Sequence, residues 1–568
     1  MTDRLAGLVP QPVSVAAAGG SLAVSSCPDV RPADAGAYAA AAAVRQLLGG
    51  LPWPLPDQYS AAQTGSRCTV ALDSALGPEA YRLTIDPSGI AIAAGGEVGA
   101  LYAVQTVRQL LPDDAWRAAP LPSTGNWELP CAVIEDRPAL AWRGAHLDVA
   151  RHFMPKRELL ALIDALAALK LNRLHLHLCD DQGWRIESRL HPALHEIGSH
   201  RSRSQITLNN EQPRAYDDIP HGGYYSLDDL AELAAYAGQR GMALVPEIDL
   251  PGHSTALLAA LPELGSGTSP AGGYQVSPDW GILENLVSPL PATMAVLRDV
   301  LGEVIAATGA RFVHIGGDEC VLDRWREDER IQAVLRDRGL VTTAELHAAF
   351  LRDLADMLAD DLAVRAVVWD EGFADHGGGR LRPDTAVMAW RGMQVARAAA
   401  EAGHDVIAAP VLPTYFDYAQ DAGASEPIAI GGPVRLADVA EFEPVPLDWP
   451  QAVRDRLIGT QFQVWTEYIP DGRALEYMIF PRACALADVA WSGRPAALSA
   501  DGQRRPGLLS RIAAHAGRLD AAGLEYRPLA GPWPWQQGGA GPRRHRVGYV
   551  VEDVAVHLSQ LAAMDGGS

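Results

Sequence analysis

The chain has 568 residues, of which 48% are hydrophobic and 20% are charged, and its formal net charge is −22. This length exceeds one ordinary domain and the composition is typical of globular proteins, so we expect a large buried core. The acidic balance argues against nucleic acid as a partner, because a phosphate backbone requires a basic surface.

The cysteines and the N-terminal segment exclude several further classes. The six cysteines are scattered without a C-x-x-C spacing, so we expect no zinc site, no redox pair and no other metal or cofactor. No apolar run reaches the roughly 18 residues of a membrane span, and the first residues lack the pattern of a signal peptide. The sequence therefore predicts a cytoplasmic protein without a membrane partner, or a secreted one if a leader has been removed.

Residues 1–135 predict a small α+β domain. Short strands are expected at Ser21–Ser25, Cys68–Leu72, Tyr81–Ile85 and Gly89–Ala94, because turn residues separate these apolar segments. A helix is expected at Glu97–Leu111, whose apolar residues recur at helical spacing. The unit contains no cluster of catalytic residue types, so we interpret it as a structural flank.

Residues 136–500 predict a catalytic (β/α)8 TIM barrel, which places the chain in the α/β class. Eight apolar, strand-like segments alternate there with amphipathic helices, as in parallel strands joined by crossovers. The expected strands are Trp142–Asp148, Arg173–Leu178, Ala243–Ile248, Arg311–Ile315, Ala366–Trp369, Ala386–Trp390, Asp405–Ala409 and Gly459–Trp465. The clearest helices are Pro155–Leu169, Ser226–Arg240, Leu290–Thr308 and Thr343–Leu362.

Local features refine this barrel and its C-terminal extension. Ser226 and Asp229 have the spacing of a capping box. The short gap between the fifth and sixth strands predicts a reduced or missing helix, and residues 422–453 read as an insertion. Residues 501–568 predict a helix at Leu508–Ala522 followed by a tail, whose basic cluster at 543–546 we interpret as solvated.

Polar and aromatic residues follow every expected barrel strand. Because barrel enzymes keep their chemistry at the C-terminal ends of the strands, these residues predict one acidic, aromatic-lined pocket. They are Asp148 and Arg151, Asp180 and Asp181, Glu247, Asp249 and His253, Asp318 and Glu319, Trp369 with Glu371, Trp390, Tyr415 with Asp417, and Trp465 with Glu467.

A pocket of this kind suits a sugar, whose C–H face packs on aromatic planes while its hydroxyls bond to acids. No glycine-rich phosphate loop is present. A metal site is the competing interpretation, but the histidines do not form a paired motif such as H-E-x-x-H. His175 and His177 should share one strand face, where a place in the core is favoured over one in the pocket.

The adjacent pair Asp318–Glu319 is unusual for a glycosidase, which normally opposes two carboxyl groups across the scissile bond. Neighbours in extended chain point to opposite sides, so the pair is poorly placed for that arrangement. A substrate that supplies its own nucleophile, such as a 2-acetamido oxygen, removes the requirement.

Six motifs resemble those of the glycoside hydrolase family 20 β-N-acetylhexosaminidases, which use such substrate assistance. They begin at Trp142, His175, Pro246, His314, Val368 and Val464, and read WRGAHLDVARHF, HLHLCDDQGWR, PEIDLPGH, HIGGDE, VWDE and VWTE. They extend over the whole barrel, and residues 1–135 resemble the family's N-terminal α+β domain.

The resemblance implies a role for each matching residue. Glu319 would be the general acid and later base, Asp318 would orient the acetamido group, and Tyr415 would donate to its carbonyl oxygen. An Asp180–His253 pair would tune Glu319, with Asp181 as a less favoured alternative. The remaining implied contacts are Trp369, Trp390 and Trp465 around the acetamido group and sugar face, and Arg143, Asp417 and Glu467 on the hydroxyls.

The sequence therefore predicts an exo-acting, retaining β-N-acetylhexosaminidase that removes terminal GlcNAc or GalNAc from β-linked glycans such as chitooligosaccharides. Two alternatives stay open: a two-carboxylate retaining glycosidase with Glu371 or Glu467 as nucleophile, and a barrel that only binds sugar. The expected partner is a small carbohydrate, with the chain as a monomer or a homodimer. No role is predicted for the thiol of Cys320.

Overall fold

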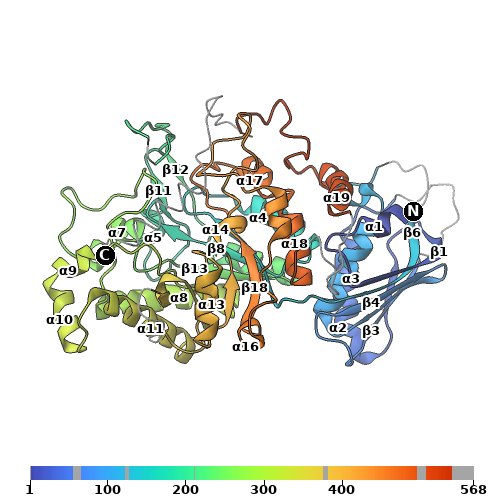
Figure 1. Cartoon of the computed structure of the whole chain (residues 1–568), viewed down its shortest axis with the longest axis horizontal. Coiled ribbons are helices and arrows are strands. Elements are labelled where there is room, and N and C mark those ends of the chain that lie inside the picture. Colours follow the sequence, from blue (N-terminus) through green and yellow to red (C-terminus); the bar gives the residue numbers. More distant parts are fainter. Residues whose placement is uncertain are drawn as a thin grey trace.

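A computed structural model describes residues 2–54, 66–121, 127–209, 211–374, 381–495 and 507–539 (Figure 1). A six-stranded sheet with its helices lies at one end of the molecule, and an eight-stranded barrel forms the rest. The predicted basic cluster at 543–546 lies outside the described residues. Among the described residues, no helix combines the length and the apolarity needed to span a bilayer.

The first domain is a mixed sheet in the order β1-β6-β4-β5-β3-β2, with β3 parallel to β2 and β5. Its strands are β1 (Ser14–Val24), β2 (Asp29–Pro32), β3 (Arg67–Leu72), β4 (Tyr81–Asp86), β5 (Gly89–Ala94) and β6 (Trp127–Asp136). Helices α2 (Tyr38–Gly49) and α3 (Glu97–Leu110) pack on the sheet and on each other. The α+β prediction is confirmed, although β2, β6 and α2 were not predicted.

The barrel closes with all eight strands parallel and in sequence order, so the TIM-barrel prediction is confirmed. Each strand overlaps the segment expected for it. The strands are β7 (Trp142–Asp148), β8 (Arg173–His177), β13 (Ala243–Glu247), β14 (Phe312–His314), β15 (Arg365–Trp369), β16 (Ala386–Ala389), β17 (Val406–Ala408) and β18 (Leu457–Phe462).

The crossover helices begin and end close to the expected residues. They are α4 (Lys156–Ala168), α6 (Leu227–Gly238), α8 (Pro291–Thr308) and α11 (Thr343–Asp360). Helix α13 (Met393–Glu401), for which no bounds were predicted, lies between β16 and β17. The capping box at Ser226 is present, because its side chain accepts from Asp229 N and Asp229 accepts from Ser226 N. Between β15 and β16 the described residues contain only the short α12 (Glu371–Ala374), as predicted. The expected C-terminal helix is α19 (Leu508–Ala522).

Buried charges join the first domain to the barrel. Asp136 at the end of β6 accepts hydrogen bonds from Lys170 Nζ (2.7 Å), Trp491 Nε1 (2.7 Å) and Tyr81 OH (2.8 Å). The Lys170 and Asp136 side chains are 1% and 0% exposed, so each needs the other to offset its desolvation. This contact holds the flanking domain against the N-terminal side of the barrel, away from the face where the strands end.

Candidate active site

A cavity of about 320 Å³ opens where the barrel strands end. This volume is at the small end of the range for ligand pockets. Ten of the predicted site residues line the cavity: Asp180, His253, Asp318, Glu319, Trp369, Trp390, Tyr415, Asp417, Trp465 and Glu467. It is also lined by Arg151 and Asp249, which were expected in the pocket from their places after barrel strands, and by residues that were not predicted, among them Asn209, Ile282, Tyr418 and Ile430.

The turn after β14 brings both members of the acid pair to the cavity. Gly316 and Gly317 have φ of +66° and +103°, and Glu319 itself has φ of +51°. A Cβ on Gly316 would lie 1.6 Å from Asp249 Oδ1, so only glycine fits there. Because β14 ends at His314, strand alternation does not apply to Asp318 and Glu319. The expectation that they would point to opposite sides is therefore wrong.

His253 links the acid pair to a buried carboxylate. Its Nε2 lies 3.5 Å from Glu319 Oε2 and 3.9 Å from Asp318 Oδ2, and its Nδ1 lies 3.2 Å from Asp180 Oδ1. Burial opposes the imidazolium, but the charge of Asp180 outweighs it and raises the pKa of His253 well above its ordinary value. Asp181 Oδ2 is farther from His253 Nδ1, at 3.8 Å, and Asp181 Oδ1 accepts a hydrogen bond from Thr255 N.

Asp318 is held in an environment that disfavours its ionised form. Burial, and then the neighbouring charges of Asp249 and Glu319, raise the pKa of Asp318 well above its ordinary value. Its Oδ1 has no hydrogen-bond partner among the described residues, although the side chain lines the cavity. A ligand N–H can therefore be satisfied at this atom.

Aromatic side chains form the walls of the cavity, and buried acids fix two of them. Trp369 Nε1 donates to Glu247 Oε1 and Trp390 Nε1 donates to Glu371 Oε2, both at 2.8 Å. The ring of Trp465 lies 5.9 Å from that of Trp369 and 6.5 Å from that of Tyr415. Burial, and then the charge of Asp417, raise the pKa of Tyr415 well above its ordinary value, so its hydroxyl keeps its proton.

A second group of polar residues faces the same cavity. Burial, followed by the charge of Glu467, raises the pKa of Asp417 well above its ordinary value, and Asp417 Oδ1 has no partner among the described residues. Burial also raises the pKa of Glu467, against the charge of Arg151. Arg151 Nη2 contacts Asp180 Oδ2 at 2.7 Å, and its guanidinium lies 5.0 Å from the Trp465 ring. These groups offer both acceptors and donors to hydroxyls.

Arg143, which was expected to bind sugar hydroxyls, lies elsewhere. It is the second residue of β7, near the start of the strand, whereas the cavity lies beyond the strand ends. Its guanidinium donates to Glu79 (3.0 and 3.1 Å), to Tyr102 OH (2.7 Å) and to Leu140 O (2.7 Å), joining the two domains. Arg151, three residues past the end of β7, is the arginine in the cavity, in agreement with its expected place after the first barrel strand.

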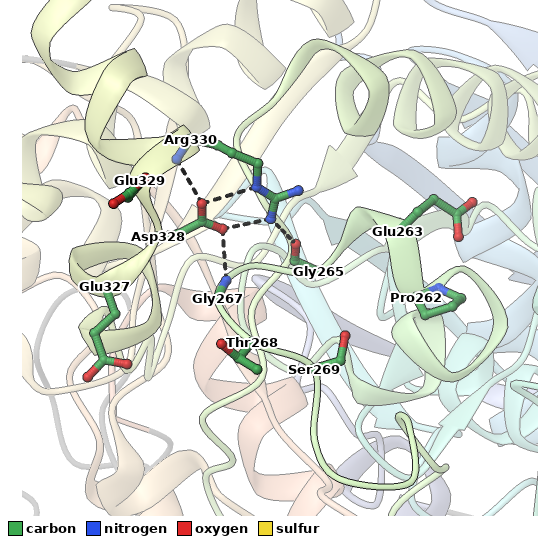
Figure 2. A pocket seen from close by; sticks show the side chains of 10 residues that line it. All are labelled: Pro262, Glu263, Gly265, Gly267, Thr268, Ser269, Glu327, Asp328, Glu329 and Arg330. Carbon is green, nitrogen blue, oxygen red and sulfur yellow. Dashed lines mark hydrogen bonds and ion pairs between the residues drawn. The ribbon is translucent and has the colours of Figure 1, made fainter.

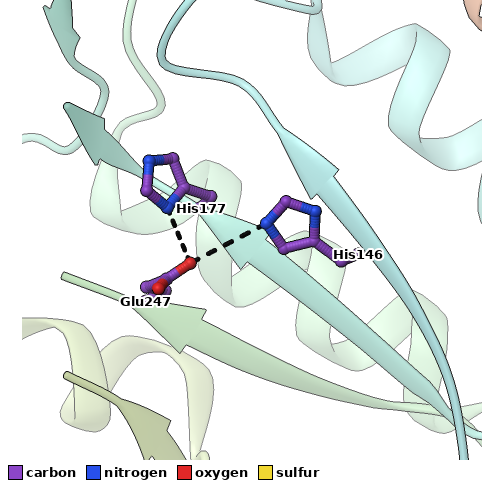
Figure 3. Close-up of side chains that lie close together, drawn as sticks. All are labelled: His146, His177 and Glu247. Atoms are coloured by element: carbon purple, nitrogen blue, oxygen red, sulfur yellow. Dashed lines mark hydrogen bonds and ion pairs between the residues drawn. The ribbon is translucent and has the colours of Figure 1, made fainter. Parts of the chain in front are cut away.

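A cluster of imidazoles surrounds the buried Glu247, and Figure 3 shows two of them, His146 and His177. His177 Nδ1, His175 Nε2 and His146 Nε2 lie 2.7, 3.1 and 3.8 Å from Glu247 Oε2. The spacing of these donors would admit a metal ion. Glu247 is, however, already a hydrogen-bond acceptor for His177 and Trp369, whereas His146 Nε2 and His175 Nε2 have no hydrogen-bond partner among the described residues. His175 and His177 share one face of β8 and belong to the core, as the sequence favoured.

Another cavity of about 430 Å³ lies between residues 262–269 and residues 327–330 (Figure 2). Its central Asp328 accepts from Gly267 N (2.9 Å) and pairs with Arg330 Nη2 (2.7 Å), which also donates to Gly265 O (3.0 Å). These bonds tie two surface segments together. Aromatic and histidine side chains are missing from its lining, so the barrel cavity is the better candidate for chemistry.

Two family models match consecutive parts of the chain. The glycosyl hydrolase family 20 catalytic-domain model matches residues 140–494, and the model of that family's domain 2 matches residues 6–137. A β-hexosaminidase of Vibrio furnissii is 34% identical over 484 residues, covering 84% of this chain and 76% of that protein. A β-hexosaminidase of Porphyromonas gingivalis is 33% identical over 84% of this chain, but this chain covers only 58% of that protein.

Solved structures agree with these matches. The family 20 exo-β-N-acetylglucosaminidase of Vibrio harveyi, in complex with N-acetylglucosamine, superposes with a TM-score of 0.77 at 30% identity. That superposition covers 93% of this chain and 79% of the other. The family 20 β-N-acetylhexosaminidase of Streptomyces coelicolor superposes with a TM-score of 0.75 at 28% identity over 93% of this chain and 99% of the other. The chain therefore belongs to glycosyl hydrolase family 20 and is a glycoside hydrolase.

Proposed function

We propose that the chain is an exo-acting, retaining β-N-acetylhexosaminidase that removes terminal GlcNAc or GalNAc from β-linked glycans. The observation that carries this proposal is the placement of Asp318 and Glu319 side by side in one aromatic-walled cavity. The cavity volume of about 320 Å³ suits a single sugar residue. The names of the relatives support the same substrate class.

The first step follows from the positions of the three catalytic side chains. The acetamido carbonyl oxygen of the substrate attacks C1 while Glu319 donates its proton to the departing glycosidic oxygen. Asp318 Oδ1 accepts the acetamido N–H, and Tyr415 donates its hydroxyl hydrogen to the carbonyl oxygen. Bond formation at C1 and loss of the aglycone leave a positively charged, oxazolinium-like ring.

The site is matched to that positive charge. Asp318 lies beside Asp249 and Glu319, and this buried negative environment disfavours its ionisation in the free protein. A cationic ring next to Asp318 reverses this cost, so the carboxylate stabilises the intermediate more than the substrate. In the second step Glu319 removes a proton from water as the water oxygen attacks C1, which opens the ring with overall retention.

The rest of the cavity would hold the sugar. Trp369, Trp390 and Trp465 pack around the acetamido methyl and the sugar face. Asp417 and Glu467 accept hydrogen bonds from hydroxyls, and Arg151 takes the place first expected for Arg143. Binding of a terminal sugar in this way makes the enzyme exo-acting.

Glu319→Gln should lower kcat by roughly 10²- to 10⁴-fold, because the amide cannot transfer a proton to the leaving oxygen. Steady-state kinetics with a series of aryl β-N-acetylglucosaminides will measure this, with the smallest loss for the best leaving groups. The matched control is Glu263→Gln, at an exposed position in the 3-10 helix Pro262–Leu264, which should leave the rates unchanged. Equal losses for all leaving groups would remove the acid role from Glu319.

Asp318→Asn should be comparably damaging towards N-acetyl substrates, because the variant loses the negative charge that stabilises the cyclic intermediate. The same assay, combined with mass spectrometry after incubation with a mechanism-based fluorosugar, separates this mechanism from its rival. A full rate for Asp318→Asn, with a covalent adduct on Glu371 or Glu467, would establish the two-carboxylate mechanism instead. If the unmodified chain does not hydrolyse p-nitrophenyl-GlcNAc, the remaining alternative is a barrel that only binds sugar.

Arg151→Ala and Arg143→Ala should differ in kind. Loss of Arg151 removes charged hydrogen bonds in the cavity and should lower kcat/KM by about 10- to 100-fold. Loss of Arg143 leaves Glu79 and Tyr102 without their partner at the domain contact, so it should lower Tm while the folded variant keeps its KM. A large rise in KM for Arg143→Ala, with unchanged Tm, would instead support the expectation that Arg143 binds sugar hydroxyls.

A further inference from the structure

A row of acid and imidazole side chains, each bonded to the next, extends from the barrel core to the proposed general acid, Glu319. Glu247 on β13 is its inner end, and Glu319 in the cavity is its outer end. The four successive contacts are Glu247 Oε2–His177 Nδ1 at 2.7 Å, His177 Nε2–Asp180 Oδ2 at 2.8 Å, Asp180 Oδ1–His253 Nδ1 at 3.2 Å and His253 Nε2–Glu319 Oε2 at 3.5 Å. Figure 3 shows the first of these contacts.

The positions of the carboxylates fix the protonation of His177. Each of its ring nitrogens faces a carboxylate oxygen, so both nitrogens carry hydrogen and the ring is an imidazolium. Burial opposes this charge, but Glu247 and then Asp180 outweigh it and raise the pKa of His177 well above its ordinary value. Other titratable groups that act on this ring include His146, His175 and Asp249.

The charged His177 determines which oxygen of Asp180 remains to accept a hydrogen bond from His253. Asp180 Oδ2 is occupied by His177 Nε2 and by Arg151 Nη2. Its Oδ1 remains to accept from His253 Nδ1, which turns His253 Nε2 towards the acid pair. The orientation of His253 at the catalytic centre therefore depends on the Glu247 carboxylate, which lies three contacts away in the core.

Glu247 also fixes a wall of the cavity. While its Oε2 meets His177, its Oε1 accepts from Trp369 Nε1 at 2.8 Å. The Trp369 ring lines the cavity, whereas Glu247 is fully buried and does not. One carboxylate thus joins the acid that protonates the leaving group to the ring that packs against the acetamido group.

We propose that Glu247 is a positioning residue that acts on catalysis through His177 and Trp369 without touching the substrate. It keeps Asp180 and His253 aligned on Glu319 and holds Trp369 against the acetamido group. The inference rests on the proposed function, because it assigns a role in the same reaction to a buried residue beneath the site.

Glu247→Gln keeps the shape of the side chain and removes its charge, and we expect kcat/KM to fall by about 10- to 100-fold. His177 then loses its main partner, so its pKa falls towards the range of about 5 to 8 in which unperturbed imidazoles titrate. Activity should accordingly show a new decline as the pH rises through that range, which the unmodified chain lacks. The loss should be larger for alkyl aglycones than for 2,4-dinitrophenol, which departs without a proton.

The matched control is Asp136→Asn, another buried carboxylate that bonds a cation and a tryptophan, but at the domain contact. It should lower Tm while leaving the pH profile and the leaving-group dependence unchanged. A structural role for Glu247 alone would give this same pattern.

His177→Gln provides a second route if Glu247→Gln does not fold. It retains a donor towards Asp180 but breaks the link to Glu247. It should therefore lower kcat/KM with the same leaving-group dependence, but without the new decline with pH, because no imidazole remains at this position to titrate. In the double variant the two losses should not add, because both remove the same connection. Trp369→Phe, which lacks only the link from Glu247 to the wall, should raise KM without changing the pH profile.

Three outcomes would overturn the inference. They are a Glu247→Gln variant with the unmodified pH profile and leaving-group dependence, fully additive losses in the double variant, and a stoichiometric transition metal found by elemental analysis and lost in Glu247→Gln. Each can occur while Glu319→Gln still abolishes hydrolysis, in which case the proposed function stands and only the role of Glu247 fails.

Discussion

The backbone turn at Gly316 and Gly317 is the constraint on which the site depends. Both residues have left-handed φ, and added Cβ atoms would lie 1.6 Å from Asp249 Oδ1 and 2.8 Å from Leu351 Cδ1. The turn therefore brings the chain against a buried acid and swings two consecutive carboxylates into one cavity. A regular strand continuing through residues 315–319 would have separated them.

Such crowding of acids is costly, and the surrounding charges offset the cost in part. Asp180 lies between two imidazoles and a guanidinium, and its pKa is lowered although burial opposes this. By contrast, burial and neighbouring acids raise the pKa of Asp249 to about 7. The cavity thus combines firmly ionised groups with acids that resist ionisation, and it suits a reaction whose intermediate is cationic.

Much of this architecture could be predicted from the sequence because buried parallel strands read as apolar runs between periodic helices. Strand β6 was missed because Pro130 argues against a central strand. In the structure Pro130 lies beyond the residues of β6 that pair with β4, and it faces Ser21, where the register of β1 is irregular. Helix α2 was missed because its run of alanines carries little periodic signal.

The site was predicted less completely than the fold. Residues at strand ends could be read directly, but Arg143 was chosen although it lies at the start of its strand. The contacts of Glu247 with His177 and Trp369 join residues on three different strands, 70 and 122 positions apart. Local patterns carry no information about such contacts, which follow from barrel closure.

The most direct test of acetamido participation changes the substrate and leaves the protein intact. In a series of aryl glucosaminides carrying N-acetyl, N-fluoroacetyl, N-difluoroacetyl and N-trifluoroacetyl groups, each fluorine weakens the carbonyl oxygen as a nucleophile. If that oxygen attacks C1, kcat/KM should fall steeply and steadily along the series. Rates that stay level across the four substrates would contradict the account, because the nucleophile would then belong to the protein or to water.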